Sequence, residues 1–189
     1  MTSVLIDPPT IEPVSVADMR AYLRVSGTQE EELLGDLVKA ARQHVERETR
    51  RALISQNWRL YLENWPFGRV IVLPVAPILS VSEVAVYDLD GDRHLLSSDD
   101  YQLDKARSPA RLRVRPGAGL PLQNLNGIEV DFTAGYGPTE SDVPENLRQS
   151  IRMLAAHWFE HREAVAEDAL EPVPFGVDRL LSTHRVPLL

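Results

Sequence analysis

Apolar residues recur at helical spacing between residues 33 and 50, and this long amphipathic segment constrains the fold more than any other feature of the chain. The residues on its apolar side are Leu33, Leu34, Leu37, Val38, Ala41 and Val45. Three glutamates at residues 30–32 precede the stripe, where the positive end of a helix dipole favours negative charge. We therefore predict a helix that is capped by Thr28 and runs to about Arg50.

The pattern changes to a period of two after this helix, which is typical of strands with one buried side. Short segments of this kind occur at residues 57–63, 70–73, 81–87, 94–96, 101–103, 111–114 and 128–132. Turns of hairpin length join them, so the sequence predicts a mostly antiparallel, β-rich section of about 80 residues.

A second amphipathic helix is predicted to open at Val143 and Pro144 and to end near Arg162. We expect the fold class to be α+β, with two long packed helices, further short helices and an antiparallel β-rich insertion between the long helices. The expected single domain of residues 1–189 divides into helical residues 15–54 and 143–163, the insertion 56–134 and a C-terminal linker and docking segment 164–189.

The composition excludes several classes of protein. The chain contains no cysteine, so it forms no disulfide and offers no thiolate to a metal. Its formal net charge is −8, and arginines are interspersed with acidic residues, which makes it a poor candidate for tight binding to DNA phosphates. The most apolar run, residues 70–79, is too short for a membrane span and contains Pro74 and Pro77, so we expect a soluble protein.

Two motifs suggest metal chemistry. His157, Glu160 and His161 match the H-x-x-E-H pattern of zinc peptidases, in which two histidines one helical turn apart hold zinc and the glutamate acts as general base. The alternative interpretation is that these histidines cap the helix or face solvent. The aspartates between Asp88 and Asp92 resemble a calcium loop, but Gly91 comes too early, and we interpret the segment as a hairpin turn.

Both termini carry apolar residues that we expect to lie outside the core of their own subunit. These residues are Val4, Leu5 and Ile6 in a proline-rich extended arm, and Val186, Leu188 and Leu189 in the tail. Docking onto a partner would remove this surface from water, which favours association by about 25 cal/mol per Å². Disorder of the terminal residues is the alternative.

Several segments, in order along the chain, are similar to one known family. They are residues 33–54, the strand segment 56–60, residues 64–66 and 70–74, the run 130–137, the helix 156–163 and the closing segment 173–177. Together they resemble the phage head-tail connector (adaptor) family in its version with a β-rich insertion, which includes the adaptors of gene transfer agents. The resemblance covers residues 15–187.

The resemblance implies a structural virion protein that is not an enzyme and has no catalytic residue, cofactor or metal. It implies a homo-oligomeric ring, commonly of about twelve subunits, at the head-tail junction of a virion that is assembled in the bacterial cytoplasm. The expected partners are the portal protein and a tail-completion (stopper) protein, with DNA passing through the lumen without sequence-specific binding, and no membrane.

The resemblance also places a portal interface in the C-terminal segment. The expected interface residues are Phe175, Val177, Leu180, Leu181, Arg185, Val186, Leu188 and Leu189. The same family has a similar helix at the H-x-x-E-H position, without a metal. A zinc-dependent hydrolase built on His157, Glu160 and His161, a different tail-completion protein, and a soluble binding module of the host are the alternatives.

Overall fold

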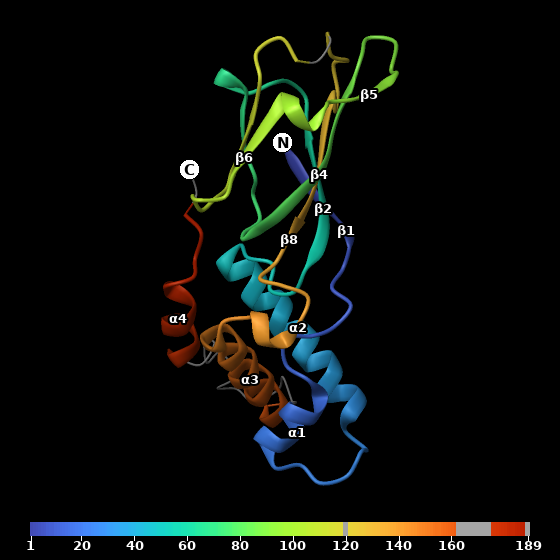
Figure 1. Cartoon of the computed structure of the whole chain (residues 1–189). Coiled ribbons are helices and arrows are strands. Elements are labelled where there is room, and N and C mark those ends of the chain that lie inside the picture. Colours follow the sequence, from blue (N-terminus) through green and yellow to red (C-terminus); the bar gives the residue numbers. More distant parts are fainter. Residues whose placement is uncertain (119–120, 162–174, 188–189) are drawn as a thin grey trace, which may run out of the picture. The chain divides into compact units, whose positions relative to one another are not determined.

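The computed structural model describes residues 1–118, 121–161 and 175–187. The chain forms two compact units, and we call them the β unit and the helical unit. The β unit contains Met1–Pro9, Ser55–Tyr136 and Val186–Leu189, and the helical unit contains Thr10–Ile54 and Gly137–Arg185. Helices and antiparallel sheets are both present, so the predicted α+β class is confirmed (Figure 1).

Four α-helices build the helical unit: α1 (Val16–Leu23), α2 (Glu31–Thr49), α3 (Glu145–Glu160) and α4 (Phe175–Ser182). The two long helices α2 and α3 pack against each other, as predicted, and α4 packs on both of them. The apolar stripe of α2 is buried at Leu34, Val38, Ala41 and Val45. Burial of this stripe explains why a period of 3.6 residues was visible in the sequence.

The start of α2 differs from the prediction. The helix begins at Glu31, with Glu30 as its N-cap residue, whereas Thr28 was expected to cap it. The Thr28 carbonyl accepts a hydrogen bond from the Glu31 amide at 3.2 Å, so residues 28–31 form a turn that leads into the helix. Glu31 and Glu32 lie in the first turn, where they interact favourably with the helix dipole.

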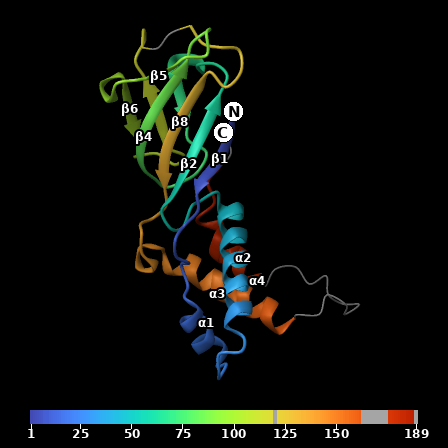
Figure 2. The same ribbon diagram turned by 90° about the vertical axis from the view of Figure 1, so that its right-hand side faces the viewer.

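The β unit contains two antiparallel sheets. The larger sheet has the order β1-β2-β8-β4-β5 (Figure 2). The smaller sheet has the order β3-β7-β6. The larger sheet is made of β1 (Thr2–Asp7), β2 (Gln56–Leu62), β8 (Ile128–Ala134), β4 (Ile78–Tyr87) and β5 (Arg93–Leu95). The smaller sheet is made of β3 (Val70–Val72), β7 (Arg111–Val114) and β6 (Tyr101–Asp104).

The core of the β unit is built from the apolar sides of these strands. Buried side chains of the larger sheet include Leu60, Val84 and Phe132, and those of the smaller sheet include Ile71 and Leu112.

No helix among residues 1–118, 121–161 and 175–187 is long and apolar enough to cross a membrane.

Strand β1 corrects the expectation for the N-terminus, which was predicted to be an extended arm. It pairs with β2 over a register that matches Thr2 to Tyr61 and Val4 to Arg59. The pairing provides hydrogen-bond partners for backbone groups that an isolated arm would leave to water. The side chains of Val4, Leu5 and Ile6 nevertheless stay exposed, as expected.

Candidate assembly interface

Helix α4 carries most of the residues that were expected to contact a portal protein. Val177 and Leu181 are fully buried in the described structure, because α4 packs on α3 and α2. Gly176 allows this close packing, since a Cβ atom at that position would lie 3.1 Å from Cε of Met153. Val177 and Leu181 therefore hold α4 on the helical unit, and their side chains are not available on its surface.

The segment after α4 is also tied to the helical unit. Nε of Arg51 donates a hydrogen bond to the His184 carbonyl oxygen at 2.5 Å. The guanidinium group of Arg185 lies 3.5 Å from the Glu48 carboxylate and 3.2 Å from the Asp178 carboxylate. These contacts fix the chain between the end of α4 and the end of α2.

The burial of Val186 corrects the expectation that the apolar tail lies outside the core of its own subunit. Val186 is only 6% exposed, because its own chain already removes its apolar surface from water. Leu188 and Leu189, and the side chain of Phe175, lie outside the described residues. Arg185 is exposed and Leu180 is half-buried, so both of these side chains have surface that is accessible to solvent.

The pH dependence of stability should reflect His184. Burial, together with the positive charge of Arg51, lowers the pKa of His184 below its ordinary value. The unfolded chain therefore binds a proton at this position before the folded chain does, and stability should fall as the pH falls below about 6.5. Replacing His184 by asparagine should flatten the change in the thermal unfolding midpoint between pH 7 and pH 5, and an unchanged slope would contradict this assignment.

The two histidines of the H-x-x-E-H motif lie at the C-terminal end of α3. Their ring centroids are 4.5 Å apart, and Nδ1 of His161 donates a hydrogen bond to the His157 carbonyl at 2.9 Å. His161 thus caps the helix, which is the structural interpretation of the motif. Among the described residues, no group of three His, Asp or Glu side chains is arranged to hold a metal.

The aspartates of the β4–β5 connection form the predicted hairpin turn. Oδ1 of Asp88 accepts hydrogen bonds from the backbone amides of Asp90 at 3.0 Å and Asp92 at 2.9 Å. Its other oxygen lies 2.8 Å from Nε2 of His94. These interactions, the contact with His94 first, lower the pKa of Asp88. The carboxylate of Asp88 is therefore used by the turn itself.

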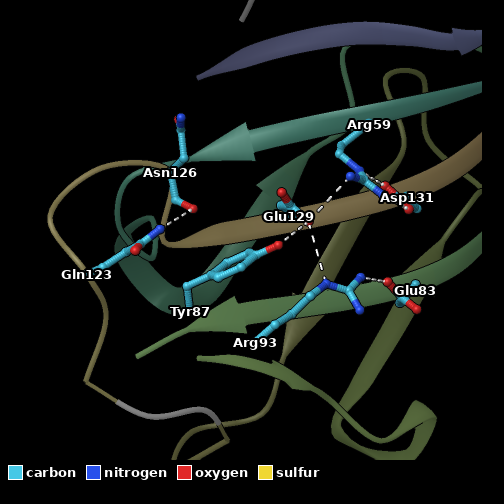
Figure 3. A network of polar contacts seen from close by, with 8 residues as sticks. All are labelled: Arg59, Glu83, Tyr87, Arg93, Gln123, Asn126, Glu129 and Asp131. Atoms are coloured by element: carbon cyan, nitrogen blue, oxygen red, sulfur yellow. Dashed lines mark hydrogen bonds and ion pairs between the residues drawn. The ribbon is translucent and has the colours of Figure 1, made fainter. Parts of the chain in front are cut away.

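A polar network on one face of the larger sheet was not predicted from the sequence (Figure 3). Arg59 on β2 makes two hydrogen bonds to the Asp131 carboxylate on β8, at 2.6 and 2.7 Å. Glu129, also on β8, accepts a hydrogen bond from the Tyr87 hydroxyl at 3.0 Å and is only 8% exposed. The network thus links three neighbouring strands across one face of the sheet.

The same network includes β5. The guanidinium group of Arg93 lies 3.8 Å from Glu129 and also pairs with Glu83 on β4. Hydrogen bonding to Asp131 raises the pKa of the Arg59 guanidinium, and burial beside Glu129 raises the pKa of Tyr87. The opposite charges of the network are paired with one another, so the arrangement stabilises strand register.

The structure is similar to components of one kind of virus-like particle. A chain from the neck of an empty gene transfer agent (GTA) particle, computed with C6 symmetry, matches with a TM-score of 0.83 and 30% identity. A chain from the virion of a native GTA particle matches with a TM-score of 0.82 and 30% identity, and one from a native neck computed with C12 symmetry with 0.81 and 29%. Each match covers 100% of this chain and 97% of the other.

No protein-family model and no curated protein matches the chain. The level of identity and the nearly complete coverage of both chains are nevertheless sufficient to assign a family. The chain belongs to the family of neck proteins of gene transfer agent particles, which are structural parts of a phage-like virion.

Proposed function

We propose that this protein is the head-tail adaptor of a phage-like particle. In this proposal, copies of the chain form a ring that joins the portal to the tail, and the ring lines part of the DNA channel. The observation that carries the proposal is the match along the whole chain to GTA neck structures, of which one was computed with C6 and one with C12 symmetry. The segments that resemble phage adaptors support the same conclusion.

The proposed mechanism is assembly, without turnover of a substrate. Identical subunits close into a ring when two different surfaces of the subunit meet and the rotation between neighbours closes. Binding to the portal favours the assembled form, because a partner that binds only this form stabilises it by mass action. The net charge of −8 suits a channel through which DNA moves without adhering to the wall.

We propose that α4 and the segment after it form the surface that meets the portal. Buried Val177 and Leu181 would act indirectly, by holding α4 on the helical unit. Arg185 and Leu180 would contact the portal directly, because they present surface beside the same helix. Leu188 and Leu189, which follow this surface in the sequence, belong to the same proposed interface.

Replacing Arg185 by glutamine tests this interface. We expect binding to purified portal to weaken about tenfold, or about 1.4 kcal/mol, because one charged contact is lost. The thermal unfolding midpoint should change little, since the pairs that Arg185 makes with Glu48 and Asp178 are exposed. Binding is measured by surface plasmon resonance with the portal immobilised.

The matched control is Arg107→Gln, which removes the same charge from an exposed position in the connection between β6 and β7 of the β unit. This control should bind portal as the unmodified protein does. Equal binding by the Arg185 variant and the control would remove α4 from the proposed interface. An absence of binding by the unmodified protein would contradict the adaptor function itself.

A further inference from the structure

The smaller sheet buries the side chains of one side and is hollowed on the other. Ile71 and Leu112 are buried on its inner side. The outer side carries the residues that alternate with these two, and it contains an open hollow of about 620 Å³. All three strands contribute to the lining of this hollow, which consists of Val70, Gln102, Leu103, Asp104, Arg111 and Arg113. We call this surface the small-sheet hollow.

The small-sheet hollow carries a positive charge. Arg111 pairs with Asp104 at 3.0 Å, so these two charges offset each other. Arg113 is exposed and lies between Val70 on β3 and Gln102 on β6 in the strand register. No carboxylate among residues 1–118, 121–161 and 175–187 forms an ion pair with Arg113. The chemistry of the hollow therefore suits an acidic group that has an apolar group beside it.

The hairpin between β4 and β5 presents this combination. Asp90 and Asp92 are exposed at its tip, and Leu89 beside them is 70% exposed. The Asp88 carboxylate accepts hydrogen bonds from the backbone amides of Asp90 and Asp92, which leaves their own carboxylates free for other contacts. Since the turn is already formed, binding through its tip costs little conformational freedom.

The hairpin and the hollow lie on different sides of the β unit. In Figure 1 the hairpin that leads into β5 projects on the right, whereas β6 lies on the left. The hairpin belongs to the larger sheet and ends in its outermost strand, and the hollow belongs to the smaller sheet. Contact between two different surfaces of identical subunits is the arrangement that generates a ring.

We propose that the β4–β5 hairpin of one copy binds in the small-sheet hollow of the next copy around the ring. Asp90 and Asp92 accept hydrogen bonds from the Arg113 guanidinium group of the neighbouring copy, and Leu89 packs against its Val70. The choice of a second copy rests on the opposite charges that one chain carries on these two surfaces. Such complementarity selects the correct neighbour and orientation. The inference rests on the proposed ring and names two surfaces that hold it together.

A disulfide between the two surfaces tests the contact in assembled particles. The chain has no cysteine, so an introduced pair is the only one that this protein can form. A chain that carries both Leu89→Cys and Gln102→Cys should give a ladder of covalent multimers on a non-reducing gel after mild oxidation, because each copy is linked to two neighbours.

The matched control replaces Leu89→Cys by Leu125→Cys and keeps Gln102→Cys. Leu125 is also 70% exposed, but it lies in the loop before β8. This control should give few multimers, because a disulfide requires Cα atoms within about 7 Å of each other.

A charge exchange gives a second measurement. Arg113→Glu should reduce the yield of complete particles about tenfold, because it places a carboxylate against Asp90 and Asp92 of the neighbour. Adding Asp90→Arg and Asp92→Arg to the same chain should restore the yield. Lys39→Glu makes the same change of charge at an exposed position of α2 in the helical unit, and it should leave the yield unchanged. The unfolding midpoint of each variant should change little, because all four positions are exposed.

Particles whose ring is intact in electron micrographs, but which give no ladder with Leu89→Cys and Gln102→Cys, would overturn this contact and leave the adaptor function in place. A yield that stays low when the charges are exchanged would overturn the pairing of Arg113 with the hairpin. Particles that contain no ring of this chain would contradict the adaptor function itself.

Discussion

Replacing Arg42 by alanine should lower the free energy of unfolding by about 3–5 kcal/mol, the usual effect of removing one partner from a buried ion pair. The Arg42 side chain is 5% exposed and pairs with Glu12 at 2.7 Å and Glu46 at 2.6 Å. Although burial alone would lower the pKa of Arg42, the hydrogen bond that Arg42 donates to Glu12 and the charge of Glu46 raise it. Alanine would leave two partly buried carboxylates without their cation.

The effect should extend beyond α2 itself, to the segment that follows it and to the segment that precedes α1. Glu46 also accepts a hydrogen bond from the Leu53 amide at 2.9 Å, and Glu12 belongs to the segment that precedes α1. Chemical denaturation followed by far-ultraviolet circular dichroism, which is dominated by the helices, measures the change.

The control is Arg47→Ala on the same helix. The Arg47 side chain is 73% exposed and lies 3.9 Å from the Glu48 carboxylate. It should cost less than about 1 kcal/mol. Equal effects of the two substitutions would show that the buried pairs contribute nothing.

Replacing Leu181 by alanine should lower the free energy of unfolding by about 2–5 kcal/mol, the range for truncating a buried leucine. Leu181 is fully buried where α4 packs on the two long helices. The substitution removes apolar contacts and leaves a cavity, so α4 should be held less firmly. Portal binding should weaken together with stability, because the proposed role of Leu181 is to position Leu180 and Arg185.

The comparison with Arg185→Gln separates these two roles. Leu181→Ala should change both the unfolding midpoint and portal binding, whereas Arg185→Gln should change binding alone. Leu125→Ala, at an exposed loop position, is the control for stability and should have an effect within about 0.5 kcal/mol. A Leu181 variant as stable as this control would mean that α4 does not depend on the contacts described for it.

The sequence was sufficient to predict the helices and most of the strands, because burial in these elements is periodic. Leu34, Val38 and Val45 share one face of α2, and the alternating burial around Leu60 and Leu62 marks β2. The strand at Thr2–Asp7 was missed because its apolar residues show no alternation. Its pairing with β2 joins segments that are far apart in the sequence, and local patterns carry no information about such a contact.

The surfaces were harder to predict than the elements. Val177 and Leu181 are apolar, which is expected both of docking residues and of core residues. The sequence therefore could not show that these two side chains lie in the core. The network around Glu129 requires the register of four strands to be known, since Arg59 meets Asp131 only through the pairing of β2 with β8. The one local signal was the repeated placement of charged residues at alternate positions of predicted strands, such as Glu129 and Asp131.

The main segment of the β unit, Ser55–Tyr136, lies between α2 and α3 in the sequence, and this determines the order in which the two helices become available during synthesis. Helix α2 leaves the ribosome before α3, and residues 50 to 144 must follow before α3 can cover its apolar stripe. At the usual rate of about 5–20 residues per second, this interval lasts about 5–20 s. In a nascent chain, the apolar side of α2 therefore stays exposed for seconds, which makes α2 a segment to which a chaperone would bind.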